Sequence, residues 1–517
     1  MRKTLTSVAA VVVAAGLVTA TPAVARDKKP QQVDTSNLTK AVTVNGILQH
    51  ERQLQVIANR NEGTRASGLP GHTESADYVA KMMRKAGYTV KRQTFTFPFS
   101  RELAPATLAE VTPNARDIET ATMDYSASGD VTGVVVPTND VVVPPSSEPG
   151  STSGCEASDF PAAPTGPAIA LIQRGTCSFE AKATNAVAAG YDAVIEFNEG
   201  QPGRDELLTG TLGNPATVPV VGISYADGAA LVAGAKTAPV TARVTTSTEV
   251  DLNRQTENVI ADLPSTGKTV KNADQVVVVG AHLDSVAAGP GINDNGSGSA
   301  AILETAEQMS QLKLTKKLER PVRFAFWGAE EAGLLGATHY VGALSDANRS
   351  KIYANLNFDM LGSPNYARLV YDGDGSDGDA GPPGSDAIEK VFTDYFDSKQ
   401  LATEPTAFDG RSDYGPFIEA GIPAGGLFSG AEEIKTPEQV IKFGGTAGVP
   451  FDSCYHQACD TIDNLNVKAL DELGDGAAHA TAVLTLSKTG LFPDGSRKAL
   501  REAAASNAPP SGHAVFR

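Results

Sequence analysis

The sequence predicts an α/β protein in which a mostly parallel mixed sheet is flanked by helices and carries an inserted, β-rich segment. Two observations support this fold class. After Asn258, strand-like hydrophobic runs alternate with helical runs, a rhythm typical of parallel sheets that are covered on both faces. From about Leu103 to Val250 the chain is instead rich in Val, Thr, Pro and Gly, with short strand-like runs. The 517 residues suffice for a large core and more than one domain.

The first 25 residues have the parts of a secretory signal peptide. Arg2 and Lys3 give a basic start, an apolar stretch spans Val8–Ala20, and AVA at positions 23–25 is a small-residue cleavage site. A membrane anchor would need a longer uninterrupted apolar span of roughly 20 residues. We therefore expect cleavage after position 25 and a secreted, extracellular protein. The polar residues that follow make 26–33 a candidate short pro-segment.

Helical periodicity dominates residues 37–88, with a break at the stretch RASGLPGH. The run ESADYVAKMMRKAGY places Ala76, Val79, Ala80 and Met83 at helical spacing and ends near Gly87, a typical stop signal. The next residues, TVKRQTFTFPF, alternate in the manner of a strand. We therefore expect helices up to Gly87 and an extended chain after it.

The inserted segment has a strand, loop, helix, strand order in GPAIALIQRGTCSFEAKATNAVAAGYDAVIEFNE, and TVPVVGISYADGAALVAGA repeats that order. Further along, strand-like runs occupy 275–280, 322–327 and 356–359, and a helix is predicted over 298–312. The polar tail from Pro493 is predicted to be peripheral. In open sheets of this kind, ligands bind beyond the carboxyl ends of the strands.

Charge and cysteine content narrow the partners and the compartment. A net charge of −17 argues against nucleic acid or an anionic membrane as the main partner, because phosphate binding needs clustered Lys and Arg. Four cysteines in a chain expected to be exported favour disulfides, and their grouping suggests Cys155–Cys177 and Cys454–Cys459. A structural zinc site at CYHQAC is the less favoured alternative, since it would need about four ligands.

Metal-type ligands follow the ends of three predicted strands. His282 and Asp284 follow VVVVG, Glu330 and Glu331 follow FAFWG, and Asp359 closes NLNFD. Because the carboxyl ends of parallel strands meet at one sheet edge, these side chains are expected to converge there. The full candidate set is His282, Asp284, Asp294, Glu330, Glu331, Asp359 and His456.

The ligand types indicate the metal. Two imidazoles with several carboxylates and no thiolate suit zinc, or cobalt or manganese, in a catalytic site. Five ligands are too many for one tetrahedral zinc that also holds water. They fit two metals about 3.5–4 Å apart that share one carboxylate.

The motifs HLDS, GINDNGSGSA, WGAEEAGLLGA, NFDM, GRSDYGPF and CYHQACDTI resemble, in this order, those of the bacterial secreted di-zinc aminopeptidases of metallopeptidase family twenty-eight. The resemblance implies a catalytic domain over 34–103 and 251–490 with a zinc-peptidase, phosphorylase/hydrolase-like fold. Residues 491–517 would be a C-terminal extension. The segment 104–250 resembles a protease-associated domain, chiefly in IALIQRGTCSFEAKATNAVAAGYDAVI.

The resemblance implies a role for each ligand at a matching position. His282 and Asp359 would complete one zinc site, Glu331 and His456 the other, and Asp294 would bridge both. The cofactor expected is therefore two Zn²⁺ per chain. The peptide bond after Asp294 is expected to be cis.

The same resemblance assigns the chemistry. Glu330 matches the general base, and Tyr455 matches the phenol that helps hold the developing oxyanion. Asp284 is placed to accept the second ring N–H of His282. The implied reaction removes the N-terminal residue of a peptide through attack of a metal-bridged hydroxide. Cys454–Cys459 would hold the loop that presents Tyr455.

Substrate preference is a weaker inference. Met360, Phe428 and Phe408 resemble the apolar pocket walls of leucine-preferring members, so a large, Leu-like N-terminal residue is expected, although such residues also occur in ordinary cores. Arg411 is the obvious cation near a motif, and because a basic residue could bind a substrate carboxylate, it leaves open which end of the peptide is recognised.

A calcium site is a further expectation. Asp34, Asp471 and Asp475 resemble a calcium site of some secreted relatives, although solvated carboxylates on a helix face are the commoner origin of such a pattern.

Other functions remain open on the same scaffold: a carboxypeptidase-type enzyme, a glutaminyl cyclase with one zinc, or a non-catalytic peptide-binding relative. The Glu-Glu pair with five ligands argues against the cyclase, and the complete ligand set argues against a non-catalytic protein. We expect a monomer that binds peptides with a free N-terminus, without nucleic acid or membrane.

Overall fold

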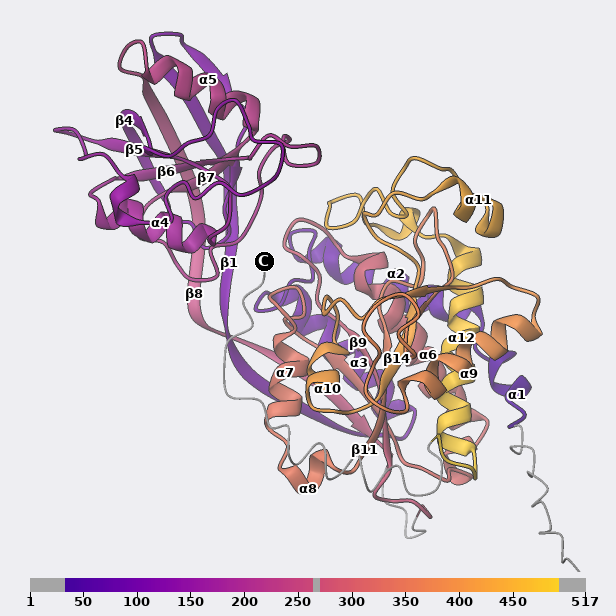
Figure 1. Cartoon of the computed structure of the whole chain (residues 1–517). Coiled ribbons are helices and arrows are strands. Elements are labelled where there is room, and N and C mark those ends of the chain that lie inside the picture. The colour runs from indigo at the N-terminus through magenta and orange to yellow at the C-terminus, as the bar shows by residue number, and fades with distance from the viewer. Residues whose placement is uncertain (1–32, 264–269, 492–517) are drawn as a thin grey trace, which may run out of the picture.

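The computed structural model describes residues 33–263 and 270–491. The predicted signal peptide and nearly all of the candidate pro-segment and C-terminal extension therefore lie outside the described residues. Two lobes are connected by the long antiparallel strands β1 (Thr89–Thr112) and β8 (Thr241–Asp262), which run from the larger lobe into the smaller one (Figure 1). Among the described residues, no helix is long and apolar enough to cross a membrane.

One sheet of 14 strands passes through both lobes. In the larger lobe its centre is parallel, in the order β14, β11, β9 and β10, while β8 and β12 pair antiparallel with β10 and β14. The predicted mostly parallel, mixed sheet is thus confirmed. The strands of this part are β9 (Val276–His282), β10 (Val322–Trp327), β11 (Ile352–Phe358), β12 (Leu369–Tyr371), β13 (Glu404–Thr406) and β14 (Ala424–Phe428).

Successive side chains of the central strands point to opposite faces of the sheet, which divides the core of the larger lobe into two layers. Val277 and Val279 of β9 contact the helices of one face, whereas Val278 contacts those of the other. Both faces are covered, so every residue of β11 is buried. One face carries α1 (Ser36–Thr39), α2 (Val44–Arg60), α3 (Pro70–Lys85), α6 (Gly298–Gln311), α9 (Ser385–Ser398) and α12 (Val467–Leu486), and the other α7 (Leu335–Gly342) and α10 (Gly415–Glu419).

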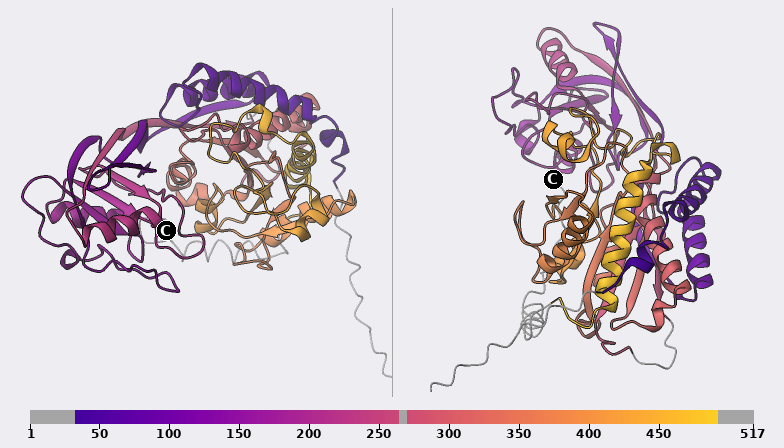
Figure 2. Two further views of the ribbon diagram at one scale, coloured as in Figure 1. Left: turned by 90° about the horizontal axis from the view of Figure 1, so that it is seen from above. Right: turned by 90° about the vertical axis from the view of Figure 1, so that its right-hand side faces the viewer.

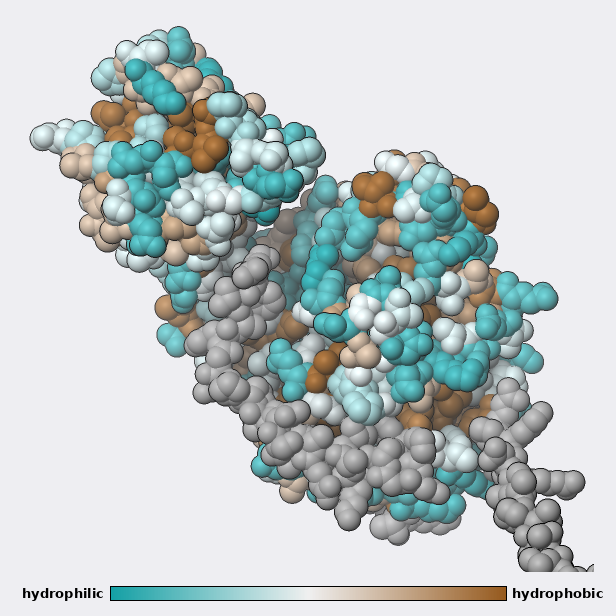
Figure 3. Space-filling view, in the orientation of Figure 1, coloured by the Kyte–Doolittle hydropathy of each residue, from teal (hydrophilic) through white to brown (hydrophobic). Residues whose placement is uncertain are grey.

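The predicted helical segments agree with the structure. Residues 61–69 separate α2 from α3, so the predicted break at RASGLPGH overlaps the start of α3 at Pro70. Ala76, Val79, Ala80 and Met83 of α3 are buried in the core. Figure 2 shows α2 and α3, in indigo, along one side of the larger lobe. The short helices α8 (Asp346–Arg349) and α11 (Pro437–Phe443) lie in surface connections, and apolar side chains are visible at the α11 end of the lobe in Figure 3.

The smaller lobe confirms the predicted strand, helix, strand order and its repeat. Four parallel strands form its centre, and the bounds are β4 (Gly129–Pro137), β5 (Ala168–Gln173), β6 (Ala193–Phe197) and β7 (Val220–Ile223), with α4 (Phe179–Ala188), α5 (Tyr225–Ala235) and the short β2 (Arg116–Ile118) and β3 (Ala121–Thr122). The predicted disulfide Cys155–Cys177 is present.

Two predicted strand bounds differ from the structure. The run predicted over 275–280 continues to His282, and the run predicted over 356–359 begins at Ile352 and ends at Phe358. β1 and β8 also cross the predicted boundaries near 103 and 250 without interruption. Cross-strand pairing explains this continuity, because Arg101 pairs with Glu249 and Glu102 with Thr248 in one antiparallel ladder.

Candidate metal centre

The carboxyl ends of three neighbouring parallel strands meet where the predicted ligands lie. His282 is the last residue of β9 and stands beside Trp327, the last residue of β10. Asp359 directly follows β11, and Glu330 follows β10 after a turn in which Ala329 has a φ of 52°. The parallel order of β11, β9 and β10 therefore brings distant parts of the chain to one sheet edge.

Five side chains form two groups that share one carboxylate. Nε2 of His282 lies 3.2 Å from Oδ1 of Asp294 and 3.2 Å from Oδ1 of Asp359. Nε2 of His456 lies 3.2 Å from Oδ2 of Asp294 and 3.0 Å from Oε2 of Glu331. In each group the ligand atoms lie within 4.8 Å of one another. The two oxygens of Asp294 thus face two different imidazoles.

A tight turn presents Asp294. The turn Ile292–Ser297 precedes α6, and the Asp294–Asn295 peptide is cis, as expected. Both oxygens of Asp460 accept backbone N–H groups from the turn, at 2.8 Å from Asn293 and 2.9 Å from Asp294. At Gly298 a Cβ atom would lie 2.1 Å from the carbonyl oxygen of Phe358, so only glycine permits this approach.

The electrostatics of the centre fit divalent cations. Burial alone would lower the pKa of His282, but Glu330 and Asp359 outweigh it and hold that pKa well above its usual value. Burial likewise lowers the pKa of His456, yet Glu331 and Asp294 raise it to about 11. Oε1 of Glu331 is buried without a hydrogen-bond partner in the described part of the chain. Imidazole nitrogens and carboxylate oxygens are the ligands of catalytic zinc, so the residues present suit two such ions.

Glu330 lies beside these groups and belongs to neither. Its Oε2 is 3.8 Å from Nε2 of His282, and its backbone N–H donates to Oδ1 of Asp284 at 3.3 Å. Burial raises the pKa of Glu330 well above its usual value, and the neighbouring carboxylates of Asp413 and Asp359 raise it further. A buried carboxyl group with a raised pKa, placed beside a candidate metal site, is suited to accepting and returning a proton.

The geometry around Asp284 differs in detail from the expectation. Nδ1 of His282 lies 3.2 Å from the backbone carbonyl oxygen of Asp284 and 3.7 Å from its carboxylate. The nearer acceptor for the second ring nitrogen is therefore the carbonyl group. The carboxylate instead accepts the N–H of Glu330, so Asp284 contacts both the ligand and the neighbouring acid.

The loop that carries His456 is closed by the disulfide Cys454–Cys459, which confirms the predicted pairing. The ring of Tyr455 stacks on that of His456 with centroids 3.8 Å apart. Nη2 of Arg411 lies 3.3 Å from the Tyr455 hydroxyl oxygen and 2.8 Å from Oε1 of Glu432. Arg411 is thus paired with an acid and oriented toward the phenol.

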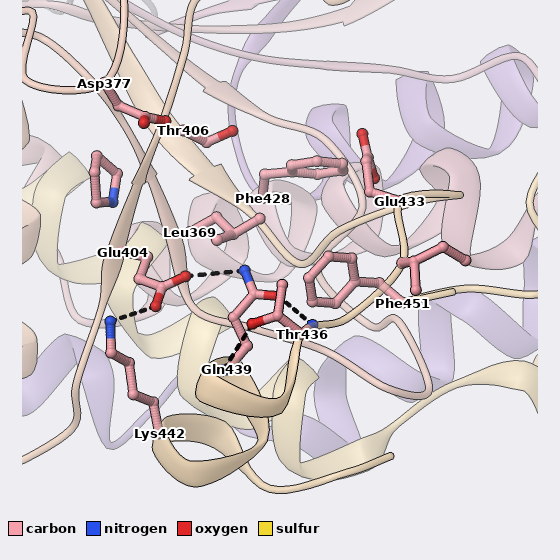
Figure 4. Close-up of a pocket in the computed structure, with 12 residues that line it drawn as sticks. Leu369, Asp377, Glu404, Thr406, Phe428, Glu433, Thr436, Gln439, Lys442 and Phe451 are labelled. Atoms are coloured by element: carbon pink, nitrogen blue, oxygen red, sulfur yellow. Dashed lines mark hydrogen bonds and ion pairs between the residues drawn. The ribbon is translucent and has the colours of Figure 1, made fainter. Parts of the chain in front are cut away.

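The predicted pocket residues are only partly brought together. Phe428 lines a cavity of about 520 Å³ beside β12 and β14, with Leu369 and Phe451 on its apolar side (Figure 4). Met360 is 2% exposed, and Phe408 stacks on Tyr371 with centroids 5.4 Å apart. Neither Met360 nor Phe408 lines this cavity.

Polar side chains line another part of the same cavity. Oε2 of Glu404 accepts from the amide of Gln439 at 2.9 Å, and Lys442 pairs with its other oxygen (Figure 4). Glu433 also lines the cavity, and its carboxylate is 3.7 Å from Arg411. Arg411 therefore links the wall of the cavity to Tyr455.

The three carboxylates predicted to bind calcium are not among the clusters of ligand atoms that the described residues form. Asp34 accepts the backbone N–H of Ser36 at 3.0 Å, at the start of α1. Burial and the neighbouring Asp471 together raise the pKa of Asp475 to about 6. The calcium site stays a prediction.

Several residues around the centre were not predicted from the sequence. Ser412 donates to Oδ2 of Asp359 at 2.5 Å, and both carboxylate oxygens of Asp413 are buried without a partner among the described atoms. Asp460 accepts the backbone N–H of Asp294, and Arg65 donates to the carbonyl group of Gly291, directly before the turn that carries Asp294. Ser412 and Asp413 lie within the motif GRSDYGPF, so membership of that motif was the sequence signal available for them.

Comparison with known proteins identifies the family. The model described as peptidase family M28 matches residues 258–481, and the model described as PA domain matches residues 131–231. An aminopeptidase of Pseudomonas aeruginosa is 45% identical over 469 residues, which cover 89% of this chain and 84% of the relative. The chain belongs to peptidase family M28.

Further similarities agree with this M28 assignment. Leucine aminopeptidase 2 of Trichophyton rubrum is 40% identical over 473 residues, covering 89% of this chain and 88% of the relative. The solved structure of BSAP, a zinc aminopeptidase from Bacillus subtilis, aligns with a TM-score of 0.59 and 27% identity over 88% of this chain and 97% of that one. The M28 chain is a metallo-aminopeptidase with an inserted PA domain, which confirms the resemblance predicted from its motifs.

Proposed function

We propose that this M28 aminopeptidase is a secreted enzyme that holds two zinc ions and removes large hydrophobic residues from peptide N-termini. His282 and Asp359 would hold one ion, Glu331 and His456 the other, and Asp294 both. The observation that carries the proposal is that the two oxygens of Asp294 face separate imidazoles, each at 3.2 Å. When bound, two zinc ions would supply an activated water at neutral pH and polarise the scissile carbonyl.

Glu330 is the proton carrier in this proposal. It accepts a proton from the attacking water and returns it to the leaving amine, which makes the departing group neutral. Its position supports the role, because Oε2 is 3.8 Å from Nε2 of His282 while the backbone is held by Asp284. A base that was also a ligand would be less free to move a proton.

Tyr455 donates its hydroxyl proton in a hydrogen bond to the developing oxyanion. Burial, together with Asp294 and Glu331, raises the pKa of its phenol, so the hydroxyl stays protonated throughout the working pH range. Arg411 donates to the phenol oxygen at 3.3 Å and restricts its position. Placed donors of this kind act where charge develops and are a large part of catalysis by peptidases.

The acidic surroundings favour a substrate with a free amine. Glu330 and Asp359 present carboxylates to a positively charged N-terminus, whereas Arg411 is already paired with Glu432 and is a poor receptor for a substrate carboxylate. This supports aminopeptidase over carboxypeptidase action. Phe428 and the apolar side of its cavity would accept a Leu-like side chain.

Secretion is supported by two features of the chain. The first 25 residues have the pattern of a signal peptide, and both cysteine pairs form disulfides. Disulfides persist in oxidising compartments outside the cytosol.

The experiment is hydrolysis of Leu-, Lys- and Glu-p-nitroanilide, each with its N-acetylated counterpart, before and after treatment with a chelator. The proposal expects the fastest turnover on the free Leu substrate, none on the acetylated forms, and loss of activity on chelation with recovery on added zinc. Cleavage of acetylated substrates, or indifference to the chelator, would contradict it. A preference for Lys or Glu would overturn the hydrophobic specificity alone.

A further inference from the structure

A fully buried arginine lies behind the metal centre. Arg65 is 0% exposed and follows α2 in the connection to α3. Its guanidinium donates to three backbone carbonyl groups: Nη1 to Leu283, Nη2 to Gly291, and Nε to Pro290 at 2.8 Å. Its own backbone N–H donates to Oγ of Ser285 at 3.0 Å.

The carbonyl groups that Arg65 binds belong to the segments that carry two of the proposed ligands. Leu283 directly follows His282, and Gly291 directly precedes the turn that carries Asp294. One rigid side chain therefore ties together the backbone on both sides of the loop 283–291. Displacement of Arg65 would alter the distance between His282 and Asp294.

Buried acidic side chains surround the guanidinium of Arg65. Glu51 of α2 is 0% exposed, and neither of its carboxylate oxygens has a hydrogen-bond partner among the described residues. A Cβ atom on Gly296 would lie 2.7 Å from Oε2 of Glu51, so this carboxylate is packed against the Asp294 turn. Asp460 binds the N–H groups of that turn. The guanidinium of Arg65 is the cation among these acids, which keeps buried negative charge balanced next to the ligands.

We propose that Arg65 is a positioning residue of the metal centre, which fixes the separation of His282 and Asp294 by clamping the carbonyl groups of Leu283, Pro290 and Gly291. This inference rests on the proposed di-zinc function. The hydrogen bonds of the Arg65 guanidinium go to backbone carbonyl groups, so its positioning effect on the ligands is transmitted through the backbone.

Lysine cannot replace the clamp, because its ammonium is a single nitrogen, whereas the guanidinium presents donors in a planar fork. Arg65→Lys keeps the charge beside Glu51 and removes the simultaneous contact with three carbonyl groups. The variant therefore separates positioning from charge balance. Groups that orient metal ligands from the outer shell typically affect metal affinity or activity by about 10- to 100-fold.

The chain offers a matched control in Arg320. This arginine is 3% exposed and also donates to three backbone carbonyl groups, those of Leu484 at 3.2 Å, Ser487 at 2.7 Å and Thr489 at 3.2 Å. It precedes β10, at the end of the strand opposite to Glu330. Arg320→Lys makes the same chemical change in a similar buried clamp, far along the sheet from the ligands.

The experiment measures the zinc affinity of metal-free wild type, Arg65→Lys and Arg320→Lys by competition with a chromophoric chelator, together with melting temperature. We expect Arg65→Lys to weaken zinc binding about 10- to 100-fold, in the usual range for outer-shell groups, and Arg320→Lys to leave it unchanged. Both variants should lower the melting temperature of the metal-free protein. Equal zinc affinity in the two variants would overturn the inference and leave Arg65 with a structural role alone.

A second variant covers failure of Arg65→Lys to fold. Arg65→Gln combined with Glu51→Gln removes both buried charges together, and the glutamine amide cannot reach three carbonyl groups. This double variant should fold and bind zinc about as weakly as expected for Arg65→Lys; wild-type affinity would contradict the clamp. A wild-type protein that does not bind two zinc ions would instead refute the proposed function, so the two failures are distinguishable.

Discussion

In the proposed mechanism, some side chains of the centre hold cations and a different one moves a proton. Asp294 offers one oxygen to each of two groups, and the ligand atoms of each group lie within 4.8 Å of one another. Glu330 is adjacent to Glu331 in sequence but is excluded from both groups. The turn after β10 therefore places two neighbouring glutamates in different positions at the centre, as the proposed mechanism requires.

The first prediction concerns Glu330. Glu330→Gln removes the base and keeps the size of the side chain, so turnover of Leu-p-nitroanilide should fall by about 10²–10⁴-fold, the usual contribution of a general base. Zinc content should stay at the wild-type value, because Glu330 is in neither ligand group. Glu331→Gln is the matched control, and it should lose zinc as well as activity. Loss of zinc from Glu330→Gln would make Glu330 a ligand.

Sequence motifs located the residues of the proposed ligand groups but not the residues around them. His282 ends β9, Asp359 directly follows β11, and Glu330 follows β10 after a short turn, so pattern and topology together located them. Arg65 contacts Leu283 across 218 positions of the chain, and no local pattern predicts such a contact. The same holds for Asp460, whose only local signal is a place in the cysteine motif.

At the level of elements, the two disulfides close loops of very different length in different places. Cys454–Cys459 spans 5 positions and encloses Tyr455 and His456, whereas Cys155–Cys177 spans 22 positions in the smaller lobe. The chain entropy that a disulfide removes from the unfolded state grows with loop length. The short loop should therefore matter more for positioning and the long one more for stability.

The second prediction compares the two pairs. Removing Cys454 and Cys459 by double serine substitution should lower kcat/KM by about 10- to 100-fold, because small displacements of reacting groups are costly. The melting temperature should fall less than in the double serine variant of Cys155 and Cys177, whose kcat/KM should stay near wild type. Kinetics and thermal melts of both variants test this, and a reversed order of effects would contradict it.

The third prediction concerns the contact of α12 with the N-terminal segment. Nδ1 of His479 lies 2.8 Å from Oγ1 of Thr35, and its ring stacks on Tyr395 with centroids 4.4 Å apart. Burial and the nearby Lys399 together lower the pKa of His479 to about 4. The unfolded chain, with a pKa of about 6.5, binds a proton first as the pH falls. His479 should therefore reduce stability progressively between pH 6.5 and 4, with no further loss below that range.

Replacing His479 by Gln removes this titration. Between pH 7 and 4.5 the variant should lose less unfolding free energy than wild type, by on the order of 2 kcal/mol at about 1.4 kcal/mol per pKa unit. Urea unfolding of the metal-free proteins at both pH values measures the difference. Comparing the two proteins cancels the opposing titration of Asp475, whose raised pKa is present in both. Equal losses would show that His479 titrates normally in the folded state.

At the scale of the whole molecule, the smaller lobe is an extension of the same sheet that carries the centre. β1 and β8 continue from one lobe into the other, so the lobes share backbone hydrogen bonds in place of a flexible linker (Figure 1). The change of composition near 103 and 250 located the insert. It did not predict that β1 and β8 continue across these positions, because a strand can keep its alternating pattern while the composition around it changes.

The fourth prediction concerns the smaller lobe. Glu102 pairs with Thr248, so replacing residues 103–247 by an Asn-Gly turn would close β1 and β8 into a hairpin. The shortened enzyme should keep its activity on Leu-p-nitroanilide and gain activity on large polypeptides relative to small peptides, because the lobe would otherwise restrict access. Rates on a peptide and on a protein substrate, compared with wild type, measure this. Unchanged activity on both would contradict a restricting role.

The central claim is that two metal ions share Asp294, and the zinc content of the purified enzyme tests it most directly. Elemental analysis of wild type and of Asp294→Asn, prepared side by side, should give two zinc ions per chain for wild type and fewer for the variant, because both groups lose an anionic ligand. One zinc ion per wild-type chain, or an unchanged content in Asp294→Asn, would contradict the account.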